Sequence, residues 1–88
     1  MKNQNFDFWA WLDEKGFEKA GEKHWNAISN GVYGNGVDTL IAKHLLGFDE
    51  KVVIYFKNES VTVKPPRTQQ EADALIYFFG LSIGKKYS

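Results

Sequence analysis

The sequence predicts a single small α+β domain in which two or three helices pack on an antiparallel β-hairpin. A third strand would extend the hairpin if residues 17–36 supply one. Its 88 residues are enough for one domain, and aromatic residues make up 16% of the chain, which excludes a disordered protein. Apolar residues follow helical spacing near both ends, and β-branched and aromatic residues concentrate at 52–63, which indicates helices around a hairpin.

Residues 6–15 predict the first helix, because three large apolar side chains fall on one face of it. This face consists of Phe8, Trp9 and Leu12. Asn5 is the expected N-cap, and Gly16 is expected to end the helix in the left-handed conformation. Phe17 should then contact Leu12, the apolar pairing that accompanies such helix ends.

Residues 17–36 are expected to supply the third strand if there is one. The pairs Asn30-Gly31 and Asn35-Gly36 are turn formers. Between them and the first helix, residues 24–28 fit either one turn of helix or a short strand.

Residues 37–48 carry apolar side chains at the spacing of a helix face, with Asp38 placed to cap its start and Gly47 to end it. The alternative is a strand that runs into a hairpin through residues 47–50. His44 lies in the middle of this apolar pattern, so we expect it to be partly buried and hydrogen-bonded within the core.

The predicted hairpin spans residues 51–64. β-branched and aromatic residues occupy both faces of its first strand, and after a turn at residues 58–59 Val61 and Val63 alternate with polar residues. Pro65 and Pro66 end its second strand, because neither can donate a backbone hydrogen bond.

A last helix follows, beginning with the capping box of Thr68 and Glu71. Gly80 is expected to end this helix, with Leu81 packed over Ile76. Residues 82–88 are expected to form a frayed tail.

The sequence offers no catalytic cluster, so we expect a protein that is not an enzyme and that holds no metal and no cofactor. It has no cysteine, and neither His24 nor His44 has another histidine at metal-ligand spacing. His24 is expected at the surface. The adjacent acids at 13–14 and at 49–50 would point about 100° apart on a helix, so neither pair forms an acid–base couple.

One motif points to nucleic acid. Gly31-Val32-Tyr33-Gly34, followed by a hairpin and a helix, resembles the glycine loop of a KH domain over residues 25–80. The resemblance implies single-stranded RNA or DNA binding in which Gly31 and Gly34 form the clamp and Tyr33 stacks on a base. It also implies phosphate contacts from Lys57, Lys64 and Arg67. Eleven basic and eleven acidic residues give zero net charge, however, which argues against a strongly basic nucleic-acid binder and against an acidic DNA mimic.

The surplus of aromatic residues favours a different function. Four of them fall outside the predicted apolar faces and are expected to form an exposed protein-binding patch: Trp11, Tyr55, Tyr77 and Phe78. Tyr55 would instead be covered if helices pack on both sides of the sheet. The favoured function is therefore a non-enzymatic module that binds another protein, or itself as a homodimer, with nucleic-acid binding as the alternative.

The expected setting is the cytoplasm. The first twelve residues lack the apolar stretch of a signal peptide, and no segment approaches the roughly 20 apolar residues that span a bilayer. Compact, neutral, cysteine-free domains are common among bacterial and phage accessory proteins, including inhibitors of host or defence machinery, and we expect a protein of that kind.

Overall fold

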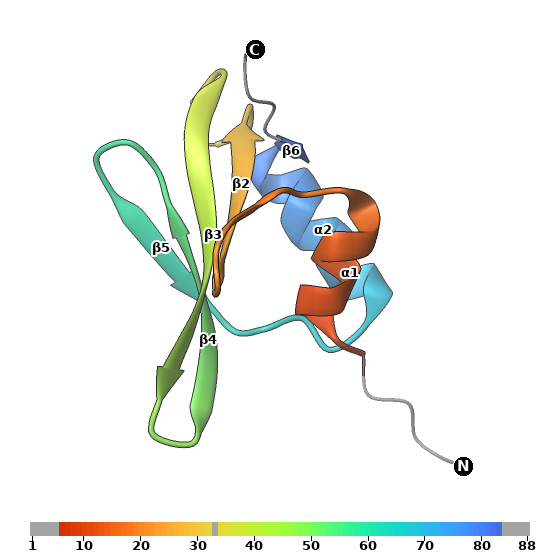
Figure 1. Cartoon of the computed structure of the whole chain (residues 1–88). Coiled ribbons are helices and arrows are strands. Elements are labelled where there is room, and N and C mark those ends of the chain that lie inside the picture. The colour runs from red at the N-terminus through yellow and green to blue at the C-terminus, as the bar shows by residue number, and fades with distance from the viewer. Residues whose placement is uncertain (1–5, 33, 84–88) are drawn as a thin grey trace.

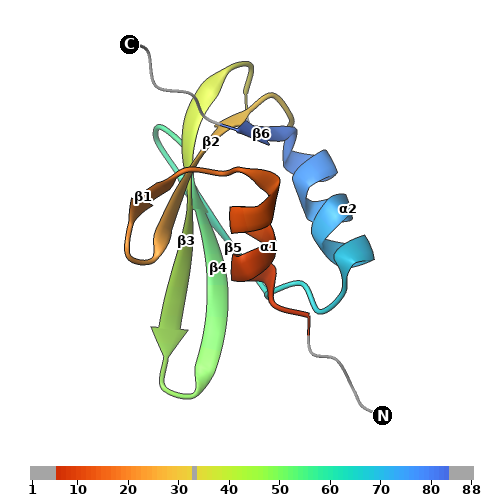
Figure 2. The ribbon, with the colours of Figure 1, turned by 45° about the vertical axis from the view of Figure 1, so that its right-hand side comes forward.

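The computed structural model describes residues 6–32 and 34–83. The elements are α1 (Phe8–Lys15), β1 (Lys19–Gly21), β2 (His24–Ser29), β3 (Val37–Leu46), β4 (Asp49–Tyr55), β5 (Ser60–Val63), α2 (Gln69–Phe79) and β6 (Leu81–Ile83). The strands form one antiparallel sheet in the order β1-β2-β3-β4-β5, and β6 pairs with β2 along the edge that β1 also uses. Both helices lie on one side of this sheet (Figures 1 and 2). The opposite side, named here the open face, carries no helix.

The prediction of a hairpin with two or three strands is wrong, because the described residues form six strands and are mostly sheet. Residues 18–36 contribute β1 and β2, so the strand alternative for residues 24–28 is the correct one. The predicted hairpin itself is present as β4 and β5.

Residues 37–48 are not a helix: they form β3 and the turn after it, as the alternative interpretation had it. The helical spacing misleads because the middle of β3 is buried on both faces of the sheet. Ile41 faces the helices and Ala42 the open face, yet both side chains are inaccessible to solvent. A strand buried on both faces loses strict alternation, and its apolar residues can then match helical spacing.

The ends of α1 follow capping chemistry. The predicted cap Asn5 lies outside the described residues; the cap is Asp7, whose carboxylate accepts hydrogen bonds from the amides of Trp9 and Ala10 at 3.1 and 3.2 Å. Gly16 ends the helix with a φ of 100°, as predicted, and the amide of Phe17 donates to the Leu12 carbonyl at 3.1 Å.

The capping box of α2 is confirmed on its Thr68 side, where the hydroxyl accepts from the amide of Glu71 at 3.1 Å. The Glu71 carboxylate accepts from the amide of Arg67 at 2.8 Å, whereas a capping box places this bond on the amide of Thr68. Gly80 ends α2 with a φ of 60°. The predicted frayed tail is wrong for Ser82 and Ile83, which pair with β2 as part of β6, and residues 84–88 lie outside the described residues.

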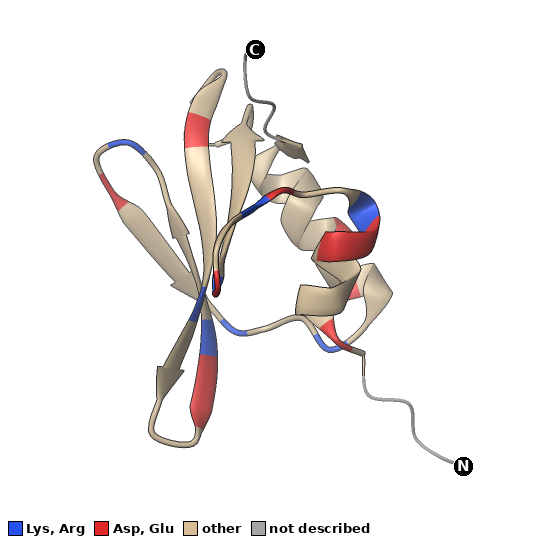
Figure 3. Cartoon of the chain, in the orientation of Figure 1, with Lys and Arg blue, Asp and Glu red and all other residues tan. Residues whose placement is uncertain are grey.

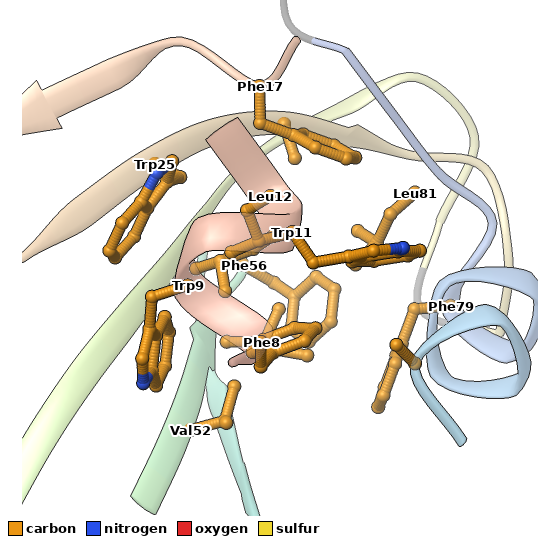
Figure 4. Packing of buried hydrophobic residues seen from close by; sticks show 14 residues of the cluster. Phe8, Trp9, Trp11, Leu12, Phe17, Trp25, Val52, Phe56, Phe79 and Leu81 are labelled. Carbon is orange, nitrogen blue, oxygen red and sulfur yellow. The ribbon is translucent and has the colours of Figure 1, made fainter. Parts of the chain in front are cut away.

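The hydrophobic core fills the space between the sheet and the two helices (Figure 4). Trp9 of α1 stacks on Trp25 of β2 with ring centroids 5.1 Å apart. Trp11 also belongs to this core: its side chain is only 7% exposed and its ring stacks on Phe8 at 5.9 Å. The prediction that Trp11 points to solvent is therefore wrong, because Leu81 and α2 cover the side of α1 that helical geometry alone leaves open (Figure 4).

Candidate protein-binding surfaces

A two-stranded ribbon leaves the body of the sheet (Figure 1). β2 pairs with β3 only as far as Ala42, and β5 pairs with β4 only from Val52 onward. Lys43 still donates its amide to the Lys23 carbonyl at 2.9 Å, and beyond it residues 44–51 pair with each other across the β3–β4 hairpin. The ribbon therefore projects past its neighbouring strands.

The end of the ribbon, residues 45–48, is named here the β3–β4 tip. It exposes Leu45 at 54%, Leu46 at 64% and the whole side chain of Phe48. The turn consists of Gly47 and Phe48 between the paired residues Leu46 and Asp49. Gly47 has a φ of 63°, and a positive φ at the first turn position is the pattern of a type II′ hairpin.

The base of the ribbon is fixed on the helix side by contacts with α1. The indole Nε1 of Trp9 donates to a carboxylate oxygen of Glu50 at 2.7 Å. The ammonium group of Lys43 lies 4.0 Å from the other oxygen of Glu50 and 5.7 Å from the centre of the Trp9 ring. The base of the ribbon is therefore held against the core by these contacts, and the β3–β4 tip extends beyond it.

The open face adds a second restraint at the base. The Tyr55 hydroxyl lies 3.0 Å from Nε2 of His44, so the tyrosine side chain spans from β4 across to β3. His44 is exposed, and the prediction that it is a core residue is wrong. The exposure of His44 follows from the strand assignment, because in β3 its side chain points to the open face and not into the interface between sheet and helices.

The four predicted protein-binding residues do not form one patch. Trp11 is in the core, and Tyr55 is half-buried on the open face. Tyr77 and Phe78 are exposed on α2, at 88% and 55%. Because the open face and α2 lie on opposite sides of the sheet, Tyr55 cannot join the α2 pair in one contact surface (Figure 2).

The three exposed apolar residues of the β3–β4 tip were not predicted from the sequence. Helical spacing places Leu45 and Phe48 on the apolar face of a helix, where they would be buried. The signal that could have found them is the run of β-branched and aromatic residues at 52–55, which starts soon after Gly47 and favours a strand. Taken together with a glycine at a two-residue turn, it indicates a long hairpin whose end has nothing to pack against.

The glycines of the KH-like motif have a packing role in this fold. The loop follows β2, where the Ser29 hydroxyl donates to the Phe79 carbonyl at 2.6 Å and the Asn30 amide donates to the Gly80 carbonyl at 2.9 Å. A Cβ atom on Gly31 would lie 2.7 Å from the Gly80 amide nitrogen. Gly31 is therefore needed where the loop touches the end of α2. Gly34 has a φ of 147°, and Tyr33 lies outside the described residues.

The basic residues of the KH-like interpretation are not gathered at this loop. Lys57 lies in the β4–β5 turn, at the same end of the sheet. Lys64 and Arg67 follow the other end of β5, because Val63 pairs with Val52 and so lies level with the base of the ribbon. Figure 3 shows basic and acidic positions interspersed over the sheet and α1.

Within residues 6–32 and 34–83, no three His, Cys, Asp or Glu side chains come together as a metal site would require. In the same residues, neither helix has the length and apolar character needed to cross a membrane. Comparison with models of known protein families, with curated proteins and with solved structures finds no match. The candidate sites therefore rest on the geometry of this chain alone.

Proposed function

We propose that the protein is a non-enzymatic binding domain that docks onto another protein through the β3–β4 tip. The observation that supports this is the exposure of Leu45, Leu46 and Phe48 together at the end of a projecting ribbon. Removing one such side chain from water is worth roughly 1.5–3 kcal/mol, and large apolar side chains exposed close together are found at partner sites.

The fixed base makes the tip suited to binding. A partner does not have to order the ribbon, because Glu50 is held by Trp9 and Lys43, and His44 is held by Tyr55. Lower ordering entropy leaves more of the burial free energy for affinity. We expect a partner with an apolar pocket that takes the ring of Phe48, and an affinity that changes little with salt because the chain has no net charge.

The setting we propose is the cytoplasm of a bacterium or of a phage-infected host, with an accessory or inhibitory role. It rests on the composition of the chain, which is compact, neutral and free of cysteine. The capture experiment described next also tests this setting, because a captured partner that lies outside the cytoplasm would contradict it.

The test is affinity capture from a native-source lysate treated with nuclease, followed by purification of the captured protein and measurement of its Kd. Phe48→Ser should abolish capture and raise the Kd at least about tenfold, which is 1.4 kcal/mol. The matched control is Tyr77→Ser, which also replaces an exposed aromatic residue, but on α2.

Capture and Kd should be the same for wild type and Tyr77→Ser. Equal affinity of all three proteins would contradict the assignment of the tip. Loss of the captured protein on nuclease treatment would favour the nucleic-acid alternative instead.

A further inference from the structure

β5 is the free edge of the sheet. The strand order ends with it, and no described residue pairs with its outer side. The amide of Phe56 donates to the carbonyl of Glu59 at 2.7 Å, which fixes the alternation of hydrogen bonds along the hairpin. Residues 59, 61 and 63 therefore bond inward to β4, and the backbone groups of Ser60, Thr62 and Lys64 point outward.

An apolar groove of about 430 Å³ runs beside this edge, between β5 and α2. Val61 and Val63 line it from the sheet, and both are only half-buried. Leu75 and Phe78 line it from the helix, and 55% of the Phe78 side chain is exposed. The edge thus combines unpaired backbone groups with an uncovered apolar strip on the helix side.

These two features require an extended strand with apolar side chains at alternate positions, and β5 itself is such a strand. If Thr62 pairs with Thr62 of a second copy in antiparallel register, Ser60 pairs with the second copy's Lys64, and Val61 faces the second copy's Val63. The two strands exchange both backbone hydrogen bonds at each of three residue pairs, so every outward group from Ser60 to Lys64 is satisfied. The apolar side chains of both copies lie on the helix side.

The boundaries of β5 agree with this register. Pro65 cannot donate a backbone hydrogen bond, and it falls just outside the paired stretch. Opposite Pro65 of one copy lies Glu59 of the other, so the paired stretch ends at the same place in both copies. Short length and flanking prolines can also protect an edge from pairing, but residues 60–64 contain no proline and the helix-side positions carry no charge.

We infer that the protein forms a symmetric homodimer through β5, in which the two sheets join edge to edge and the two Phe78 side chains cover the joint. A second copy fits better than an unrelated peptide, because β5 supplies both the hydrogen-bond pattern and the apolar side chains that its own edge requires. This inference is independent of the proposed function, since it involves neither the β3–β4 tip nor its partner.

The test is sedimentation of the purified full chain over a concentration series up to the millimolar range. Thr62→Pro removes an outward amide while leaving the inward bonds of β5 intact, and Phe78→Ser removes the apolar cover from the groove. We expect a dimer whose Kd rises at least tenfold in each variant, and hydrogen exchange at the amides of Ser60, Thr62 and Lys64 that slows as the protein concentration rises.

Two controls keep the outcomes distinct. Tyr77→Ser should leave the dimer unchanged, and Phe48→Ser should do the same, so that failure of the proposed function is seen separately. Circular dichroism must show that Thr62→Pro is folded; if it is not, Phe78→Ser decides. A monomer at all concentrations, a dimer that both folded variants preserve, or occupation of this edge only by a different protein would overturn the inference.

Discussion

Replacing Gly31 by alanine tests the contact between the β2–β3 loop and the end of α2. The added Cβ atom would lie 2.5 Å from the Phe79 carbonyl oxygen and 2.7 Å from the Gly80 nitrogen. Real Cβ atoms do not approach backbone atoms this closely, so the loop and the helix end must separate. The Ser29–Phe79 and Asn30–Gly80 hydrogen bonds join the same two chain segments and would lengthen with this separation.

The expected loss of stability follows from these contacts. Overpacking at a site that cannot relax costs about 1–3 kcal/mol, and two weakened hydrogen bonds add about 1 kcal/mol each. The free energy of unfolding should therefore fall by about 3–5 kcal/mol, a large part of the total for a domain of this size. For such a domain, this loss lowers the Tm by about 12–40 °C.

The assay is thermal and urea unfolding followed by far-ultraviolet circular dichroism. Gly21→Ala is the matched control, because its Cβ would lie at an ordinary 3.4 Å from the Nδ1 atom of His24 and its φ is not positive. It should change the free energy of unfolding by less than about 0.5 kcal/mol. The KH-like interpretation predicts something different for Gly31→Ala: a folded protein of normal stability that no longer binds oligonucleotides. A stability equal to that of Gly21→Ala would refute the packing argument.

Three further substitutions test other contacts by the same unfolding assay. Ser29→Ala removes a fully buried donor from the Phe79 carbonyl and should lower the free energy of unfolding by about 1–3 kcal/mol; no change would show that the bond is not formed. Trp9→Phe keeps a ring in the core but loses the hydrogen bond to Glu50, so the free energy of unfolding should fall by about 1.5–3 kcal/mol. Amide exchange in the ribbon should also become faster, and unchanged exchange would contradict the fixed base. Thr68→Ala should cost about 1 kcal/mol by removing the cap of α2, whereas Thr68→Ser should be nearly neutral, and equal values would argue against the cap.

Local chemistry made the helix ends and the hairpin predictable from the sequence. Gly16 and Gly80 both adopt the left-handed conformation expected of them, and Thr68 caps α2. In each case the interacting groups lie within a few residues of each other, so the sequence alone contains the information.

The rest of the sheet depends on contacts between distant segments. β2 becomes a strand because β3 and β6 pair with it, and β6 comes from the opposite end of the chain. Trp11 is buried for the same reason: the surface that covers it includes Leu81, seventy residues later in the sequence. A helical wheel contains no information about such partners.

For the candidate site, the sequence predicted the type of side chain but not its position. Exposed apolar and aromatic side chains are present, as the composition suggested, but two of those that matter for the proposals, Leu46 and Phe48, could be placed only once β3 was known to be a strand. Of the two predicted residues on α2, Phe78 lines the apolar groove beside β5 and Tyr77 does not.

The central claim is that the β3–β4 tip contacts a partner protein, and photo-crosslinking tests it most directly. A benzophenone-bearing residue is introduced in place of Phe48, or in place of Tyr77 as the control, and cells of the native source are irradiated. We predict one discrete protein adduct at position 48 that position 77 does not give. Absence of an adduct at position 48, or the same adducts from both positions, would contradict the claim.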